Sequence, residues 1–394
     1  MDAYILSAVR TPVGKFLGEL SDLTAPKLGA AALAEAVKRS GLPTAAIEDV
    51  IVGNVVQAGV GQAPARQAAL LAGIPDTVPA HTVNMVCGSG LKAVMLAAQA
   101  IRAGDAHRIL AGGMESMSHA PFLLPGLRRG HKYGDTPTVD ALIRDGLWCP
   151  IENWPMGDAA EYIATKCRID RANQDRFSAQ SHHRAEAAWA RGDFDAEVIP
   201  VTLASVGRKG PDRVVSRDEG IRADTSAETL GKLRPAFKPD GTVTAGNASQ
   251  LSDGAAAVVV ASATAVKESG ATPLARVVAY SQSAVNPKEI FIAPIPAVHS
   301  VLKLAGLSQS QIDLWELNEA FAAQMLACSQ GLGLDESRVN IHGGAIALGH
   351  PIGASGARIL VSLIHALHRR QLRYGLASLC LGGGSAVAMI VERV

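Results

Sequence analysis

Short apolar runs and amphipathic segments alternate along the first part of the chain. Four apolar runs have the length and composition of buried strands: Ile5–Val9, Val50–Val52, His81–Val86 and Arg108–Ala111. The segments between them carry apolar residues at helical spacing and are predicted helices: residues 27–40, residues 64–72 and the stretch from Gly88 to Gly104. This alternation predicts a mostly parallel sheet covered by helices.

The same alternation returns after Pro273. Predicted strands and helices follow one another in this order: strand Leu274–Tyr280, helix 296–305, strand Leu314–Leu317, helix 319–330, strand Arg338–Ile341, helix 356–369 and strand Gly375–Leu381. Residues 115–245 differ, being richer in charge, Trp, Pro and His, with a helix around 172–191 and loops around 207–226. We therefore divide the chain into three predicted parts: an N-terminal α/β unit at 1–114 that 246–270 complete, an inserted loop domain at 115–245, and a C-terminal α/β unit at 271–394.

The two α/β units resemble each other. Val83–Gly88 has the same shape as Val339–Gly344, and each opens a turn of small residues into an amphipathic helix. Each helix is followed by a strand that ends in glycines. These repeats predict a duplication, with two similar sheets packed through shared helices as α-β-α-β-α layers. Chance resemblance between α/β units is the alternative.

Composition excludes several classes of protein. The 394 residues carry a net charge of +1 and only 4% aromatic residues, which argues against binding to nucleic acid or an anionic membrane surface. The apolar run Ala255–Ala261 is too short to span a bilayer, and no basic-then-apolar leader precedes the first strand. The five cysteines are scattered without a C-x-x-C pair, which argues against zinc and disulfides and suits a reducing compartment. We expect a cytoplasmic protein.

A glycine-rich turn at residues 339–358 is the most distinctive stretch. It contains five glycines, Pro351 and two histidines. Pro351 fixes its own φ and disfavours helical geometry at His350. The pattern predicts a strand end, a rigid turn that presents His350, and a buried helix. A phosphate-binding turn or a plain tight turn is the alternative.

Four side chains that could carry chemistry lie where predicted strands end. Cys87 precedes a helix, whose N-terminus would lower the pKa of the thiol, and His350 could be its base. Cys380 precedes the glycines from Gly382 on, whose N–H groups could hold an oxyanion, and Asn318 follows another strand. The alternatives are core cysteines, a structural histidine and a helix cap at Asn318. Strand ends of α/β sheets are where active sites gather.

Six motifs in order make the whole chain resemble the thiolase family. They are Asn84–Leu91, Ala111–Ser118, Gly241–Ser249, Asn318–Ala322, Gly343–Arg358 and Cys380–Gly384. The resemblance implies that Cys87 is the acylated nucleophile, His350 its base and Cys380 the acid and base at the α-carbon. It implies that Asn318 holds a water which, with His350, forms one oxyanion hole. The N–H groups of Cys87 and Gly382 would form a second hole.

The resemblance also implies coenzyme A as co-substrate, with no prosthetic group and no metal. The positions that match the family's CoA-lining and channel residues are Leu147, Met156, Arg222, Thr229, Phe237, Ala245, Ser249, Leu251 and Phe321. A solvated loop charge is the alternative for Arg222, and ordinary core packing for Met156 and Phe321. A homodimer or homotetramer is implied, with Leu123–Leu127 as a tetramer contact or merely a buried loop.

We therefore predict a thiolase that cleaves 3-ketoacyl-CoA with CoA into acyl-CoA and acetyl-CoA, reversibly. Pro155 stands where acetoacetyl-specific members carry His, which favours longer chains, while Ile290 and Phe291 lie in a stretch that shapes the acyl pocket. His342 replaces a common Asn, with no role assigned. The alternatives are an acetoacetyl-CoA-forming biosynthetic enzyme, a decarboxylating ketosynthase-like enzyme and, from another class, a non-catalytic CoA- or lipid-binding protein.

Overall fold

The computed structural model describes residues 1–205 and 211–394 and contains one large sheet with three small hairpins. The strands of the large sheet are β1 (Ala3–Arg10), β2 (Gly14–Lys15), β3 (Asp49–Gly53), β4 (Ala80–Val83), β5 (Arg108–Ser116), β12 (Ser252–Ser262), β13 (Ala275–Ala284), β14 (Leu314–Leu317), β15 (Tyr374–Leu381) and β16 (Ser385–Arg393). The hairpins are β6 (Phe122–Leu123) with β7 (Val139–Asp140), β8 (Trp148–Cys149) with β9 (Trp154–Pro155), and β10 (Val201–Leu203) with β11 (Arg213–Val215).

Helices cover both halves of the sheet, and others belong to the inserted segment. They are α1 (Ala25–Ser40), α2 (Pro64–Leu71), α3 (Ser89–Ala103), α4 (Met156–Lys166), α5 (Arg171–Ala190), α6 (Ala227–Gly231), α7 (Ala263–Ser269), α8 (Pro294–Ala305), α9 (Ala322–Leu332), α10 (Ala345–Leu348) and α11 (Ile352–Arg370). A π-helical turn at Ile143–Leu147 and short 3-10 turns complete the description. In the described residues, none of the helices combines the length and the hydrophobicity that a membrane crossing requires.

The sheet consists of two halves with the same internal arrangement. In the N-terminal half β3 pairs in parallel with β4 and β5, and β5, β12 and β1 then pair antiparallel. In the C-terminal half β14 pairs in parallel with β15, and β15, β16 and β13 then pair antiparallel. The register also shifts at matching places, between Ile5 and Ser7 in β1 and between Val277 and Ala279 in β13. The chain is therefore a duplicated α/β fold.

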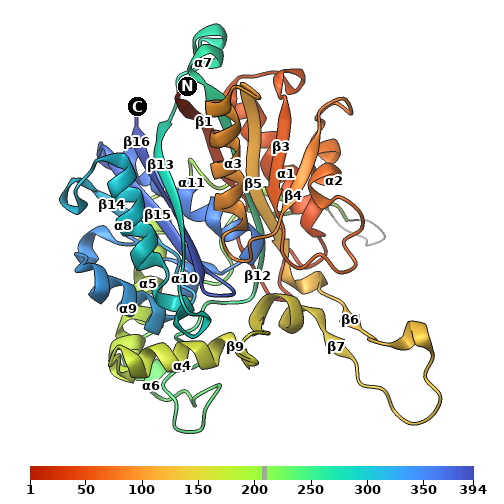
Figure 1. Cartoon of the computed structure of the whole chain (residues 1–394), viewed down its shortest axis with the longest axis vertical. Helices are drawn as coiled ribbons and strands as arrows, with labels where there is room; N and C mark the ends of the chain where they lie inside the picture. The colour runs from red at the N-terminus through yellow and green to blue at the C-terminus, as the bar shows by residue number, and fades with distance from the viewer. Residues whose placement is uncertain (206–210) are drawn as a thin grey trace.

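The two predicted sheets are joined at one edge. The pairs Tyr4–Arg276 and Ile5–Ala275 join β1 to β13, so that the two halves form one ten-stranded network. The halves lie side by side, with β14–β16 and β13 at the left and β3–β5 at the right of Figure 1. Only the first residues of the two edge strands come close enough to exchange hydrogen bonds.

The helices form three layers around these two halves. α3 and α11 pack against each other and against strands of both halves, and their apolar residues form the central core. α1 and α2 cover the outer face of the N-terminal half, and α8 and α9 cover that of the C-terminal half. This arrangement is the predicted α-β-α-β-α layering.

Two glycines let the central helices approach closely. A Cβ on Gly90 of α3 would lie 2.8 Å from the Ala357 nitrogen, and a Cβ on Gly356 of α11 would lie 2.5 Å from the Leu91 nitrogen. Real Cβ atoms do not tolerate such distances, so backbone packs directly on backbone here. The contacts are reciprocal, which relates α3 and α11 by a local twofold axis.

Several predicted elements differ in detail. The predicted strand Arg338–Ile341 is wrong, because this segment makes a single bridge, Trp315–Val339, before the glycine turn. The predicted helix 319–330 begins at Ala322, and the predicted helix 356–369 already begins at Ile352. The final strand β16 was not predicted as an element. The predicted loops at 207–226 fall partly outside the described residues.

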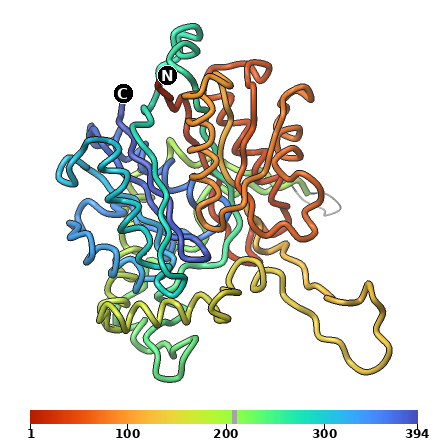
Figure 2. Tube along the Cα trace, viewed as in Figure 1, coloured from red at the N-terminus to blue at the C-terminus, as the bar shows by residue number. Residues whose placement is uncertain are grey.

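The inserted segment covers one end of the sheet and sends out a long arm. This arm, built on β6 and β7, extends away from the body at the lower right of Figure 2. Phe122, Leu124 and Leu127 on it are 67%, 46% and 50% exposed, so the buried-loop alternative for this stretch is wrong. The domain boundaries at 114/115 and 245/246 stay predictions.

Candidate active site

Cys87 lies in a tight turn between β4 and α3. The preceding residue, Val86, has a positive φ of 46°, an unusual conformation for a β-branched side chain. The Ser89 hydroxyl holds this turn, donating to the Val86 carbonyl at 2.6 Å and accepting from the Met85 N–H at 2.8 Å. The sequence therefore fixes the backbone just before the half-buried thiol.

His350 is held by the glycine turn as predicted. Gly349 has a φ of +111°, and the His350 N–H donates to the Gln250 carbonyl at 3.0 Å. The Ser355 hydroxyl donates to the Pro351 carbonyl at 2.9 Å, and its oxygen lies 2.6 Å from Nδ1 of His350. With the hydroxyl proton committed to Pro351, Nδ1 is the protonated nitrogen and Nε2 keeps its lone pair.

Asn318 lies directly after β14, and its backbone N–H donates to the Ser378 carbonyl at 3.1 Å. Its side chain is 1% exposed, and Nδ2 lies 3.4 Å from Nε2 of His350. The alternative role as a helix cap is wrong, because α9 begins only at Ala322, with Phe321 at its N-cap. Asn318 and His350 are thus neighbours although 32 residues separate them.

Cys380 and Gly382 lie at the end of β15, where it turns into β16. Cys380 is 2% exposed, and its side chain packs in an apolar cluster with Ile290, Phe291 and Phe321. In the part of the chain that the structure describes, the N–H of Gly382 has no hydrogen-bond partner. This N–H group is available to an acceptor in the cavity.

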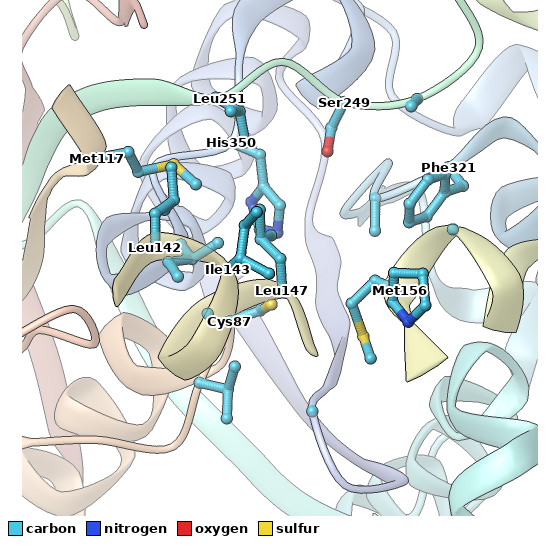
Figure 3. Close-up of a pocket in the computed structure, with 18 of the residues that line it drawn as sticks. Cys87, Met117, Leu142, Ile143, Leu147, Met156, Ser249, Leu251, Phe321 and His350 are labelled. Atoms are coloured by element: carbon cyan, nitrogen blue, oxygen red, sulfur yellow. The ribbon is translucent and has the colours of Figure 1, made fainter. Parts of the chain in front are cut away.

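One cavity of about 460 Å³ joins these residues (Figure 3). Cys87, His350, Cys380 and Gly382 all line it. The predicted residues that line it as well are Leu147, Met156, Phe237, Ser249, Leu251 and Phe321. In Figure 3 Cys87 and His350 face each other below Leu251, with Met156 and Phe321 across the opening. Separate cavities for the two sulfurs and the imidazole are therefore excluded.

Other predicted residues lie elsewhere. Arg222, Thr229 and Ala245 are exposed and do not line this cavity, and Thr229 forms the capping box of α6 with Ser226. Asn318 lies behind His350 rather than in the wall. Wall residues that the sequence prediction missed include Phe16, Val86, Met117, Leu142 and Ile143. Apolar side chains in loops and short helical turns carry no signal of their own, and only the fold brings them here.

The protonation states correct one expectation. Burial raises the pKa of the Cys87 thiol to about 12, and the Glu115 carboxylate adds to this, so the expected lowering by the helix N-terminus is wrong. Burial, helped by the Arg358 charge, lowers the pKa of His350 to about 3. Burial and the neighbouring Cys87 raise the pKa of Cys380 well above its ordinary value. The resting site therefore contains two thiols and a neutral imidazole, and the imidazole can accept a proton.

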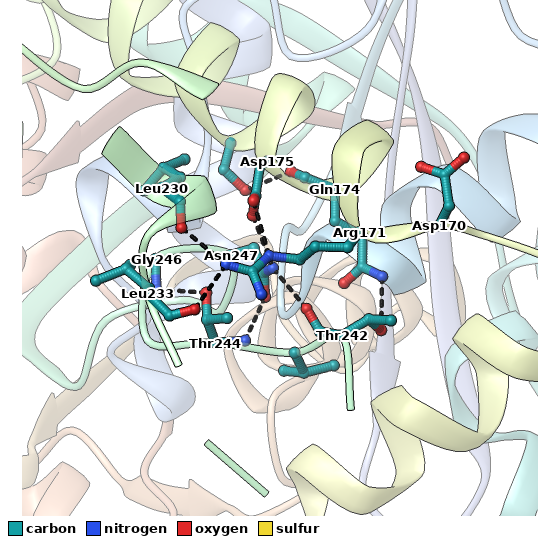
Figure 4. A network of polar contacts seen from close by, with 12 residues as sticks. Asp170, Arg171, Gln174, Asp175, Leu230, Leu233, Thr242, Thr244, Gly246 and Asn247 are labelled. Atoms are coloured by element: carbon teal, nitrogen blue, oxygen red, sulfur yellow. Dashed lines mark hydrogen bonds and ion pairs between the residues drawn. The ribbon is translucent and has the colours of Figure 1, made fainter. Parts of the chain in front are cut away.

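A polar network positions the loop that carries Ser249 (Figure 4). Arg171 donates to the carbonyls of Leu230 at 2.8 Å and Leu233 at 2.9 Å, and pairs with Asp175 at 2.7 Å. Asp175 in turn accepts from Asn247 at 3.1 Å. Beyond it the Ser249 N–H donates to the Ala320 carbonyl at 3.0 Å, which brings this loop against the residues before α9.

His342 and Pro155, which depart from the family pattern, lie in different surroundings. His342 is 3% exposed, its Nε2 lies 3.4 Å from an Asp193 oxygen, and it packs edge-on against Phe194. It therefore joins the glycine turn to the inserted segment, away from the cavity. Pro155 does line the cavity, beside Met156.

A half-buried thiol that shares one cavity with a neutral imidazole and a second thiol has the chemistry needed for acyl transfer through sulfur. The comparisons with known proteins agree with this class. Residues 3–264 match the thiolase N-terminal domain and residues 271–393 the thiolase C-terminal domain, so the chain belongs to the thiolase family. It is thus an acyltransferase that exchanges acyl groups between CoA and a cysteine.

Similar proteins match over the full length. The chain is 52% identical to an acetyl-CoA acetyltransferase of Cupriavidus necator, with 100% of this chain and 99% of the relative covered. It is 51% identical to one of Escherichia coli, with 99% and 98% covered. A solved structure, the acetyl-CoA acetyltransferase of Bacillus anthracis, has a TM-score of 0.97 at 44% identity, with 100% of this chain and 99% of that chain covered.

Proposed function

We propose that this thiolase cleaves short 3-ketoacyl-CoA thioesters, acetoacetyl-CoA first among them, with CoA into two acyl-CoA molecules, and catalyses the reverse condensation. The observation that carries the proposal is the single cavity that Cys87, His350 and Cys380 share. The printed names of the relatives from Cupriavidus necator and Escherichia coli support acetyl transfer.

In the first half-reaction, the Cys87 sulfur attacks the C3 carbonyl while its proton passes to Nε2 of His350. The bond between C2 and C3 then breaks, leaving an acyl group on Cys87 and an enolate of acetyl-CoA. The Cys380 thiol gives its proton to C2 of this enolate, and acetyl-CoA leaves. The raised pKa of Cys380 suits this step, because the thiol stays protonated until a strong base forms beside it.

In the second half-reaction, the Cys380 thiolate takes the proton of an incoming CoA thiol. The CoA sulfur attacks the acyl carbonyl on Cys87, the bond to the Cys87 sulfur breaks, and His350 returns its proton to that sulfur. Charge develops on a carbonyl oxygen in both halves, where N–H donors such as Gly382 would stabilise it. Both thiols and the imidazole end as they began.

Thiolysis of acetoacetyl-CoA tests this proposal. The loss of the magnesium–enolate absorbance of acetoacetyl-CoA on addition of CoA measures cleavage, and Cys87→Ala is the matched inactive control. An active Cys87→Ala variant would overturn the proposal. Cleavage by neither protein would favour the non-catalytic CoA-binding alternative.

A preference for longer chains is the second candidate, because Pro155 lines the cavity at the position that favours it. Comparing kcat/KM on 3-ketoacyl-CoA substrates of four and eight carbons separates the two. The proposed short-chain preference requires the higher kcat/KM on the shorter substrate.

The proposal also includes a cytoplasmic homotetramer. The exposed apolar residues Phe122, Leu124 and Leu127 on the arm support an assembly through this arm, because surface apolar clusters mark contacts. Light scattering on the protein and on a variant with Leu124→Ser and Leu127→Ser measures the assembly, which the variant should reduce to dimers.

A further inference from the structure

We propose that Arg358 is a positioning residue that orients the Asn318 amide and thereby keeps Nε2 of His350 as the proton acceptor for Cys87. The inference rests on the proposed function. Arg358 lies on α11, is 2% exposed and does not line the cavity, so it does not touch substrate. Its influence must pass through the side chains it contacts.

The first argument is a directed chain of hydrogen bonds. Nη2 of Arg358 donates to Oδ1 of Asn318 at 3.4 Å. Because a guanidinium is only a donor, the amide must turn its Nδ2 donors the other way, towards Nε2 of His350 at 3.4 Å. Nδ1 of His350 meanwhile donates to Ser355. The donor from Asn318 at Nε2 and the proton held on Nδ1 by Ser355 both favour the tautomer that keeps the lone pair on Nε2.

The second argument is that Arg358 is poorly satisfied where it lies. Within the described residues Nε and Nη1 have no hydrogen-bond partner, and neither has Oε2 of Glu316, 3.7 Å from Nη1. Arg10, equally buried, bonds to Glu197 at 2.6 Å and to Asp218 at 2.7 and 3.0 Å. A buried cation without such partners costs stability, so a purely structural role explains Arg10 and not Arg358.

The third argument comes from the local twofold axis. The reciprocal contacts of Gly90 and Gly356 make Lys92 of α3 the counterpart of Arg358. Lys92 is only half-buried, and its ammonium lies 3.4 Å from Gln282. The fold therefore accepts a cation at this position that reaches the surface, whereas Arg358 is turned inward to Asn318.

The charge of Arg358, like its hydrogen bond to Asn318, favours an unprotonated Nε2 on His350. It lowers the pKa of His350, in addition to burial. The charged groups that face Arg358 are Glu316, whose Oε2 forms a long ion pair with Nη1 at 3.7 Å, and Glu319, Glu197 and Arg10. His350 lines the same cavity as the two thiols.

Two substitutions separate orientation from charge. Arg358→Lys keeps the cation without the planar donors, and Arg358→Met removes both. We expect kcat for acetoacetyl-CoA cleavage to fall about tenfold or more in each, with KM changed less than about threefold, because the cavity wall stays intact. Arg358→Met should also raise the pH at which kcat/KM falls off on the acid side, whereas Arg358→Lys should not.

Asn318→Ala provides the coupling test. If Arg358 acts through Asn318, adding Arg358→Lys to Asn318→Ala costs little more activity than Asn318→Ala alone. The matched controls are Arg10→Lys, at a buried arginine that does not line the cavity and does not contact Asn318, and Lys92→Met, at the twofold counterpart. Both should keep kcat and the acid limb of the wild type.

Three results would overturn the inference: an Arg358→Lys variant with the wild-type kcat, losses that add fully to those of Asn318→Ala, or an Arg358→Lys variant that does not fold. Arg358→Lys decides alone if Arg358→Met is insoluble. A wild-type protein without thiolysis would instead overturn the proposed function, which keeps the two failures apart.

Discussion

The two halves of the sheet share a strand order and differ in what their strand ends do. In the N-terminal half Asn54 follows β3 and Glu115 is the next-to-last residue of β5; in the C-terminal half Asn318 follows β14 and Cys380 is the next-to-last residue of β15. Glu115 accepts hydrogen bonds from Asn54 at 2.8 Å and from backbone N–H groups, including that of Gly353 at 3.0 Å. Cys380 faces the cavity instead.

This difference separates a structural residue at the end of β5 from a reactive one at the equivalent place in β15. The donors around Glu115 are tied to one carboxylate, which holds the loop after β3 against the start of α11. Burial raises the pKa of Glu115 to about 7, while these N–H groups oppose the rise. In the C-terminal half the reactive groups keep atoms free for a ligand. The same architecture thus supports a hydrogen-bonded carboxylate at the end of β5 and a reactive thiol at the end of β15, while the second thiol, Cys87, follows β4.

The largest expected effect is that of His350→Asn. Asparagine cannot take the Cys87 proton, so kcat/KM for acetoacetyl-CoA cleavage should fall by about 10²–10⁴-fold. Thiolysis kinetics with a melting curve as folding control measure this. Wild-type activity in a folded variant would show that His350 of the C-terminal half is not the base.

Cys380→Ser sharpens the comparison within the site. Serine is a far weaker acid, so the rate of acetoacetyl-CoA cleavage should fall by roughly 10²–10³-fold. The rate at which acetyl-CoA acetylates Cys87 should fall less. Mass spectrometry of the enzyme and steady-state kinetics give the two readouts. Equal losses in both would contradict a greater demand on Cys380 at the α-carbon than at the CoA thiol.

The pH dependence of Cys87 alkylation tests the corrected protonation state. A thiol with a pKa of about 12 beside an imidazole with a pKa of about 3 is un-ionised at neutral pH. The rate of alkylation by iodoacetamide should therefore rise about tenfold per pH unit between roughly pH 6 and 9, since only the thiolate reacts. A rate that is flat across this range would indicate a resting thiolate–imidazolium pair.

Glu115→Gln is the matching change in the N-terminal half, and its effect on activity should be the smallest. The amide cannot accept all the N–H groups that the carboxylate holds, so the free energy of unfolding should fall by about 1–3 kcal/mol. Activity of the folded variant should change less than about tenfold. Urea unfolding and thiolysis measure both, and a loss of activity as large as that of His350→Asn would erase the distinction between the halves.

Much of this organisation could be predicted from the sequence. Glycine, proline and apolar spacing are local signals, and they place Cys87 before α3 and His350 before α11. The internal repeat predicts the duplication. The long motifs indicate the family, and the resemblance to it assigns roles to Asn318 and Cys380.

What failed depends on surroundings that no local pattern records. The pKa of Cys87 follows from the depth of the cavity rather than from the helix N-terminus. The joining of the two halves depends on two residue pairs at the start of β1 and β13. The segment 338–341 has strand-forming residues, but only Val339 finds a partner strand. The contact between Arg358 and Asn318 spans 40 residues.

The most direct test of the account is acylation of the enzyme by acetyl-CoA alone. After rapid acid quenching, intact mass and peptide mapping should show one added acetyl group on Cys87, lost again on addition of CoA. No acetyl group on Cys87, or one on Cys380 instead, would contradict acyl transfer through the thiol that faces His350.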